Sequence, residues 1–256
     1  MKKLLLTLLI IGLIVGLFVG CNVVPPTEGE GEGEGEGEGE GEEEVTRVVM
    51  VELFTKEGCP YCKIVDPIFE QLADEYERSE VVFVEERVYS IYTFDEIQDR
   101  YEWYLPSTSD RGTPNILFNG LNQRIYGSST YVAIKGKINL ELGKDAKISI
   151  SAVRNSDSTT TTISGTIKNI DSSTLYNLVI NGMIFKNRGE TGLKYSVTDI
   201  LEEQKETVAT LEPGSTRNFS FTIEDTNWNV NGLNGVIFVQ DTDSSKKEIL
   251  QAIYVD

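Results

Sequence analysis

Two cysteines three positions apart, Cys59 and Cys62, stand at the junction between two segments of different hydrophobic periodicity, and this pair constrains the fold more than any other feature. The stretch Val48–Phe54 is a β-branched, mostly apolar run that predicts a strand. After the second cysteine, apolar side chains recur at helical spacing from Ile64 to Tyr76. We therefore expect a strand that leads, through the cysteine pair, into a helix.

The position of this pair at the start of a helix predicts redox chemistry. Free backbone N–H groups and the helix dipole stabilise a thiolate there, so we expect the pKa of the Cys59 thiol to lie below the free value of about 8.5. Cys59 is then the attacking sulfur. Cys62, one turn further along, can attack the mixed disulfide that Cys59 forms with a substrate and release it. Such chemistry uses the Cys59–Cys62 disulfide itself and needs no separate cofactor.

The rest of the first half of the chain alternates strand and helix patterns. A β-branched run predicts a second strand over Val81–Val88, and Thr93 and Glu96 have the spacing of a capping box that opens a helix. Two short apolar runs flank Asn119-Gly120, a pair typical of the turn in an antiparallel hairpin, and a last helical pattern follows. This order predicts an α/β domain over residues 45–142, with helices around a mixed sheet.

The ten residues from Phe54 to Lys63 read Phe-Thr-Lys-Glu-Gly-Cys-Pro-Tyr-Cys-Lys and resemble the active-site segment of the thioredoxin and glutaredoxin superfamily. The Cys-Pro-Tyr-Cys core is the version typical of glutaredoxins. Two further features match the superfamily: Pro67, five residues after the second cysteine, and Gly112-Thr113-Pro114, before the first strand of the hairpin. The resemblance covers roughly residues 46–142 and implies a thioredoxin-like fold there.

The resemblance also implies roles for individual residues. Pro114 would follow a cis peptide bond and lie against the active-site disulfide. Thr113 would offer its backbone to an extended substrate segment, a form of strand addition. Pro60 suits the first turn of the helix because it has no N–H group to leave unpaired. The expected site residues are Cys59, Cys62 and Pro114 for catalysis, and Thr113, Pro60 and Tyr61 for substrate binding.

Three positions depart from the superfamily pattern. Gly58 stands where thioredoxins often carry tryptophan, and the glycine pair with a following aspartate that helps glutaredoxins to hold glutathione is not evident after Gly120. Glutathione specificity is therefore not implied. Glu52, seven residues before Cys59, is offset by one residue from the buried acid that shuttles the proton of the second cysteine in thioredoxins. It is therefore either such a proton shuttle for Cys62 or a solvated carboxylate at the strand edge.

The second half of the chain has a different texture, with short alternating runs separated by Ser, Thr, Asn and Gly. We predict an all-β, immunoglobulin-like sandwich over residues 143–256, without the cysteine pair of antibody domains. Asp241-Thr242-Asp243 is read as a turn, with a calcium site as the alternative. The predicted strands are Ile148–Val153, Thr160–Ile167, Leu178–Phe185, Arg217–Ile223, Gly235–Val239 and Ile249–Val255.

The N-terminal residues have the pattern of an export signal. Lys2 and Lys3 precede an apolar run, Leu4–Val19, which is shorter than the roughly 20 residues that a spanning helix needs. The run ends at Cys21 in a segment that resembles a bacterial lipobox. We therefore expect a signal peptide over residues 1–20, lipidation of Cys21, and a disordered Glu-Gly linker over residues 21–44. An uncleaved signal anchor is the alternative, and both put the remainder outside the cytoplasm, in the cell envelope.

Composition excludes several classes of function. A formal net charge of −18 argues against nucleic acid as a partner, and the absence of histidine removes the commonest general base. With no second cysteine pair, a zinc site cannot be completed, and Lys63 stands where haem attachment requires histidine. We expect no bound metal.

The interpretation that these features favour is a lipid-anchored thiol-disulfide oxidoreductase for exported proteins. Exported protein clients and a membrane electron donor or quinone-linked oxidant are its expected partners. Two alternatives remain. The chain is either a redox-inactive binding lipoprotein that combines a thioredoxin fold with a β-sandwich, or a structural lipoprotein that spaces layers of the envelope.

Overall fold

The strand before the cysteine pair and the helix after it are both present in the computed structural model, which describes residues 45–224 and 227–255. β1 spans Val49–Thr55 and α1 spans Cys62–Glu75, with Pro67 inside the helix. No helix among the described residues is long and apolar enough to cross a membrane. The expected signal peptide, the lipidated Cys21 and the Glu-Gly linker lie outside the described residues.

The other elements follow the predicted order in the first half and are nearly all strands in the second. They are β2 Val81–Arg87, α2 Asp95–Tyr104, the 3-10 turn η1 Thr108–Asp110, β3 Asn115–Phe118, β4 Gln123–Tyr126, α3 Tyr131–Leu142, β5 Ile148–Ser156, β6 Thr161–Asn169, β7 Leu175–Lys186, β8 Ser196–Ile200, the 3-10 turn η2 Glu202–Gln204, β9 Glu206–Leu211, β10 Thr216–Ile223, β11 Leu233–Asp241 and β12 Ile249–Val255. The six strands predicted in the second half are all present, and β8 and β9 are additional.

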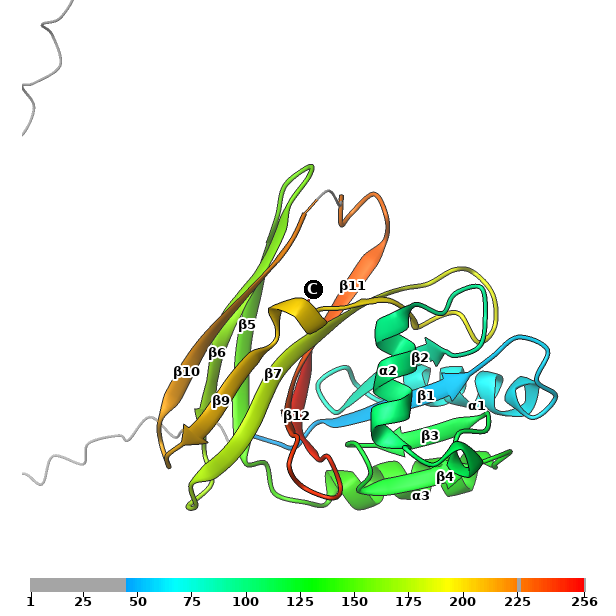
Figure 1. The fold of residues 1–256 in the computed structure, drawn as a ribbon, viewed down its shortest axis with the longest axis horizontal. Helices are drawn as coiled ribbons and strands as arrows, with labels where there is room; N and C mark the ends of the chain where they lie inside the picture. The colour runs from blue at the N-terminus through cyan, green and yellow to red at the C-terminus, as the bar shows by residue number, and fades with distance from the viewer. Residues whose placement is uncertain (1–44, 225–226, 256) are drawn as a thin grey trace, which may run out of the picture. The chain divides into compact units, whose positions relative to one another are not determined.

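Strand β1 lies between β2, to which it is parallel, and β3, to which it is antiparallel, and β4 completes this edge (Figure 1). Because side chains alternate along a strand, β1 contributes to two cores. Val51 and Leu53 pack with α1 and α3, whereas Met50 and Phe54 pack with α2. Helices therefore cover both faces of a mixed sheet, an arrangement with thioredoxin-like features.

The second half of the chain continues the same sheet. β8 pairs with β2 and with β7, so that the strand order runs β12-β11-β7-β8-β2-β1-β3-β4, and β9 pairs with β7. The sheet has nine strands within the described residues. β8 thus pairs with the edge that β2 would otherwise expose, and an open edge of a sheet is a liability that proteins commonly cover.

The expected free-standing immunoglobulin-like sandwich is not clearly present. β10, β6 and β5 form a small antiparallel sheet, which shares a hydrophobic core with β7, β9, β11 and β12 of the large sheet. The second half is therefore two-layered and all-β, but one of its layers belongs to the sheet that also contains β1. The domain boundary between residues 142 and 143 stays a prediction.

The turn prediction for the hairpin is confirmed and the capping box is wrong. Asn119 and Gly120 have φ angles of 47° and 70°, as the turn pair requires. α2, however, begins at Asp95 with Phe94 as its N-cap and no side-chain cap. The hydroxyl of Thr93 instead donates to the carbonyl of Arg87 and accepts from the N–H of Ser90, at 2.8 Å in both cases. Thr93 therefore stabilises the loop before the helix.

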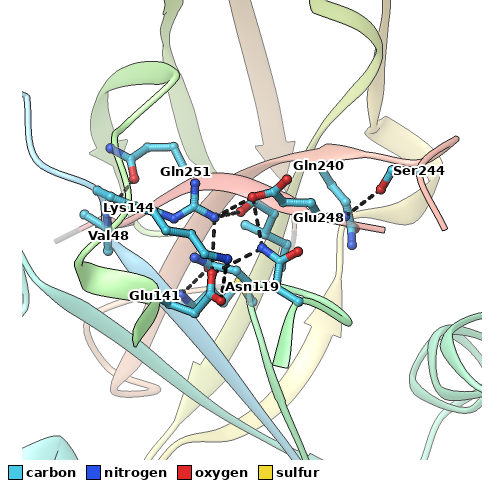
Figure 2. A network of polar contacts seen from close by, with 12 residues as sticks. Val48, Asn119, Glu141, Lys144, Gln240, Ser244, Glu248 and Gln251 are labelled. Atoms are coloured by element: carbon cyan, nitrogen blue, oxygen red, sulfur yellow. Dashed lines mark hydrogen bonds and ion pairs between the residues drawn. The ribbon is translucent and has the colours of Figure 1, made fainter. Parts of the chain in front are cut away.

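A buried polar network ties the end of the chain to the first half (Figure 2). The guanidinium group of Arg47 lies 2.7 Å from the carboxylate of Glu248 and 3.5 Å from that of Glu141, at the end of α3. Asn122 donates to both carboxylates, at 2.9 and 3.2 Å. The side-chain oxygen of Gln251 accepts from the N–H of Val48 at 2.7 Å. The β11–β12 hairpin is thereby bonded to the start of β1, to α3 and to the β3–β4 turn.

Candidate redox site

The two cysteines of the motif form a disulfide bond. Their Cα atoms are 5.3 Å apart, and Cys62 is the first residue of α1 while Cys59 lies in the turn before it. The backbone N–H of Cys62 donates to the sulfur of Cys59 at 3.1 Å. Because a donor directed at sulfur favours the charged form of a thiol, this contact supports a reactive thiolate at Cys59 after reduction.

The segment before β3 lies beside this disulfide. The peptide bond between Thr113 and Pro114 is cis, and the carbonyl oxygen of Thr113 lies 3.4 Å from the sulfur of Cys59. Four of the expected site residues, Cys59, Cys62, Thr113 and Pro114, are therefore together. Pro60 and Tyr61 lie in the turn between the cysteines and are exposed. The chemical roles assigned to these six residues stay predictions.

Residues outside the motif hold the Thr113 segment in position. The hydroxyl of Tyr101, on α2, donates to the carbonyl of Gly112 at 2.6 Å, and the side-chain amide of Asn115 donates to the same carbonyl at 3.1 Å. Arg124, on β4, in turn donates to the side-chain oxygen of Asn115 at 2.7 Å. No local sequence pattern identifies these residues, because they come from three different elements.

The ring of Tyr126 lies against the backbone at Gly112. A Cβ atom built there would lie 2.6 Å from Cε2 of Tyr126, so a side chain would collide with the tyrosine ring. The ring of Tyr126 is itself 57% exposed. Together with Tyr61, which is 58% exposed, it gives the surface near the disulfide an aromatic character. Such side chains can contact a polypeptide substrate.

Glu52 lies neither at the strand edge, as a solvated carboxylate would, nor on the side of the sheet where it could shuttle the proton of Cys62. It is fully buried, which excludes a solvated carboxylate at the strand edge. It also projects to the α2 face of the sheet, where its carboxylate accepts from Arg100 at 2.7 Å and from the hydroxyl of Tyr104 at 2.9 Å. Its neighbour Leu53 packs on the α1 face, the face that carries Cys62. Because side chains alternate across a strand, Glu52 is separated from Cys62 by the sheet.

The carboxylate of Glu52 belongs to a buried network on this opposite face. Gln240, on β11, donates to the hydroxyl of Tyr104 at 2.7 Å, so the network spans both halves of the chain. Burial, followed by the nearby Glu52, raises the pKa of Glu86 well above its usual range. Arg100, whose Nε lies 2.7 Å from the carboxylate of Glu52, is the cation that compensates Glu52.

Replacing Arg100 by methionine is expected to lower the free energy of unfolding by about 3–5 kcal/mol, because Glu52 would remain buried without its cation. Urea denaturation of the variant at neutral pH measures this loss. Adding Glu52→Gln to the variant should recover most of the stability, and a double variant as unstable as the single one would contradict the prediction.

A cavity of about 450 Å³ lies beside α2, apart from the redox pair. One wall consists of Glu96, Asp99, Arg100 and Trp103 on the helix. The other is formed by residues on or beside β7, β8, β9 and β11, namely Val179, Asn181, Ile200, Glu202, Lys205, Thr207, Gln240 and Thr242. The volume is in the range that holds a small molecule. None of the six expected site residues lines it.

The acidic segment Asp241-Thr242-Asp243 is a turn. The side chain of Asp241 accepts from the N–H groups of Asp243 and Ser244, each at 3.1 Å, and Asp243 accepts from Asn177 at 2.7 Å. These bonds engage one carboxylate oxygen of Asp241 and one of Asp243 within the protein. In the part of the chain that the structure describes, no group of three or more His, Cys, Asp or Glu side chains is arranged to hold a metal ion.

The fold of this chain is similar to that of solved structures. No protein-family model and no curated protein matches the chain. HBP35 of Porphyromonas gingivalis is similar, with a TM-score of 0.67 at 16% identity over 82% of this chain and 74% of that one. Protein AGR_C_4864 from Agrobacterium tumefaciens has a TM-score of 0.58 at 17% identity, over 82% and 94% of the two chains.

These two likenesses extend across both halves of the chain, since each covers 82% of it. A thiol-disulfide isomerase from Corynebacterium glutamicum matches 39% of this chain, with a TM-score of 0.30 at 13% identity. At such identities structural similarity establishes fold alone. The chain thus has a fold with thioredoxin-like features and a Cys59–Cys62 disulfide, which together indicate thiol-disulfide chemistry.

Proposed function

We propose that this chain is a membrane-anchored thiol-disulfide oxidoreductase that acts outside the cytoplasm on the thiols or disulfides of exported proteins. The observation that carries the proposal is the contact of the Cys59 sulfur with two backbone groups. The N–H of Cys62 lies 3.1 Å from it and the carbonyl of Thr113 lies 3.4 Å from it. The first group favours a thiolate, and the second marks where a substrate strand would pass.

The reaction exchanges one disulfide for another. In the reducing direction, the thiolate of Cys59 attacks one sulfur of the substrate disulfide, and the other substrate sulfur leaves as a thiolate. The thiolate of Cys62 then attacks the sulfur of Cys59, the bond between Cys59 and the substrate breaks, and the substrate leaves with two reduced sulfurs. The two cysteines supply the two electrons that reduce the substrate and end as the Cys59–Cys62 disulfide. Run in reverse, the same steps oxidise a substrate dithiol.

The location rests on the N-terminal sequence. The export signal ending at Cys21 supports a lipid anchor, and the Glu-Gly linker would hold the redox unit away from the membrane surface. An exported oxidoreductase of this kind needs a membrane electron donor or a quinone-linked oxidant to regenerate its active state. The direction of exchange depends on the reduction potential of the cysteine pair.

The test is the reduction potential of the pair, measured on the full chain carrying Cys21→Ser, by equilibration with dithiothreitol or glutathione buffers. A value near −270 mV would identify a reductase and one near −120 mV a strong oxidant, by comparison with proteins of those functions. Alkylation of the thiols after quenching, followed by mass spectrometry, gives the reduced fraction. A pair that exchanges with neither buffer would overturn the proposal.

The second candidate function is a redox-inactive binding lipoprotein, and the cavity beside α2 is the observation that favours it. That cavity is lined by both halves of the chain and is separate from the cysteines. On this reading, a chain with both Cys59 and Cys62 replaced by alanine would restore the phenotype of a strain that lacks the protein. The oxidoreductase proposal requires the opposite result.

A further inference from the structure

The cavity of about 450 Å³ beside α2 lies between one side of that helix and strands of the large sheet. The helix lines it with Glu96, Asp99, Arg100 and Trp103, which stand at positions i, i+3, i+4 and i+7. Residues at this spacing lie on the same side of an α-helix. The cavity is therefore built from a single stripe of α2 and from strands of the second half of the chain.

The buried polar groups of the lining have partners within the protein. The side-chain amide of Asn181, on β7, donates to Glu202 at 3.0 Å. The guanidinium group of Arg100 lies 2.7 Å from the carboxylate of Glu52 and donates to the side-chain oxygen of Gln240 at 3.4 Å. These bonds fix the wall in place. Because Glu52 compensates Arg100, this guanidinium group does not offer a ligand an unbalanced positive charge.

The remaining charges of the lining are mainly negative. The ammonium group of Lys205 is paired with the carboxylate of Glu202. Glu96 is partly exposed and Asp99 is exposed, and in the described part of the chain neither has an ion-pair partner. A further acid, Asp199 on β8, lies close enough to Glu96 that burial, followed by this neighbour, raises the pKa of Asp199. A cation is the charge that this side of the cavity attracts.

The aromatic part of the lining also favours a cation. The ring of Trp103 is partly exposed, and the face of an indole ring attracts positive charge. The protein itself provides an example, since Nζ of Lys247 lies 4.4 Å from the centroid of this ring, although Lys247 does not line the cavity. Val179 and Ile200 add apolar surface. The lining thus combines an apolar wall, an aromatic ring and two carboxylates without partners.

We propose that this cavity binds a small organic cation, a molecule in which an ammonium group is attached to an apolar body. The ammonium group contacts Glu96 and Asp99, and the apolar body packs against Trp103, Val179 and Ile200. A free small molecule is the occupant that fits, because about 450 Å³ is in the range of small-molecule sites. The inference goes beyond the proposed oxidoreductase function, since the cavity lies apart from the cysteine pair.

The test is a calorimetric titration of the full chain carrying Cys21→Ser with phenethylamine, a primary amine with an aromatic body. The comparison compounds are 2-phenylethanol, which is neutral, and 3-phenylpropionate, which is an anion. We expect saturable binding of one phenethylamine per chain, and binding of both comparison compounds that is at least about tenfold weaker. Each exposed ion pair contributes up to about fivefold in affinity, and the ammonium group has two carboxylate partners.

A pair of double variants makes the test specific to the cavity. Glu96→Gln with Asp99→Asn should weaken the binding of phenethylamine about tenfold and leave that of 2-phenylethanol within about twofold. The matched control is Asp95→Asn with Glu102→Gln, which removes the same number of charges from α2 at exposed positions outside the lining. The control should bind phenethylamine as the unsubstituted chain does. Thermal unfolding of each variant checks that it is folded.

Tryptophan fluorescence locates the bound molecule. The chain has two tryptophans, and Trp228 is buried in the core that β5, β6 and β10 share with the large sheet. Binding of phenethylamine should therefore change the emission of Trp103 alone. The change should be absent in Trp103→Phe, while calorimetry of that variant should still detect binding. A fluorescence change that persists in Trp103→Phe would place the molecule elsewhere and would overturn the inference.

The other outcomes are equally decisive. Absence of saturable phenethylamine binding below about 10 mM would overturn the inference, and so would binding of 2-phenylethanol with equal affinity. Equal weakening in the two double variants would show a general effect of the negative charge of α2, which would also contradict a site in the cavity. Replacing Cys59 and Cys62 by alanine should leave the binding unchanged, so its outcome is independent of the measured reduction potential.

Discussion

A fragment of residues 45–142 is expected not to fold, although it contains every element of the thioredoxin-like half. The core on the α2 face is shared: Met50 and Val84 of the first half pack in one cluster with Phe185, Val236 and Phe238 of the second. Exposing a large apolar side chain costs about 1.5–3 kcal/mol. Loss of a few such contacts therefore consumes the 5–15 kcal/mol by which a typical domain is stable.

The loss of polar partners adds to this effect. Removing residues 143–256 would leave Arg47 without Glu248, Glu141 without Lys144, and the N–H of Val48 without Gln251. Near-UV circular dichroism and thermal unfolding of the fragment, beside a chain of residues 45–256, measure the outcome. A fragment with a cooperative unfolding transition of its own would contradict the expectation and would establish the predicted boundary between residues 142 and 143.

Replacing one cysteine at a time is expected to have opposite consequences at the two positions. Cys59→Ser should reduce the rate of disulfide exchange to the uncatalysed background. The substitution removes the attacking sulfur, which accepts the hydrogen bond from the N–H of Cys62. The Cys62→Ser variant should still form a mixed disulfide with a substrate through Cys59. It cannot form the Cys59–Cys62 disulfide that would release the substrate. It should therefore accumulate as a mixed disulfide with its client proteins.

Non-reducing electrophoresis and mass spectrometry of proteins captured by Cys62→Ser measure this trapping. The matched control is the double variant Cys59→Ser/Cys62→Ser, which should capture nothing. Capture through Cys59→Ser rather than through Cys62→Ser would reverse the assignment of attacking and resolving sulfurs. Equal, negligible capture by both single variants would favour the binding lipoprotein.

Local patterns in the sequence were sufficient for most individual elements. The β-branched run before Cys59 and the helical spacing after Cys62 correspond to β1 and α1, and the six alternating runs of the second half correspond to strands. β8 and β9 were not predicted. Their sequences, Ser-Val-Thr-Asp-Ile and Glu-Thr-Val-Ala-Thr-Leu, are short and at least half polar, so they carry a weak strand signal.

The faces of the strands were decided by tertiary structure. The alternation along β1 predicts that Glu52 and Leu53 point to opposite sides, but it does not say which side carries the helix of the cysteine pair. Only the packing of α1 against Leu53 assigns Glu52 to the far side.

Three local features of the molecule follow from the sequence: a cysteine pair at a strand-to-helix junction, a turn at Asn119-Gly120, and the Thr113-Pro114 segment, which was identified by resemblance. These features depend on spacing along the chain. The tertiary structure alone decided that the strands of the second half join the sheet of the first, through the pairing of β8 with β2. Strand pairing depends on which edge is free after the chain collapses, and no local pattern records it.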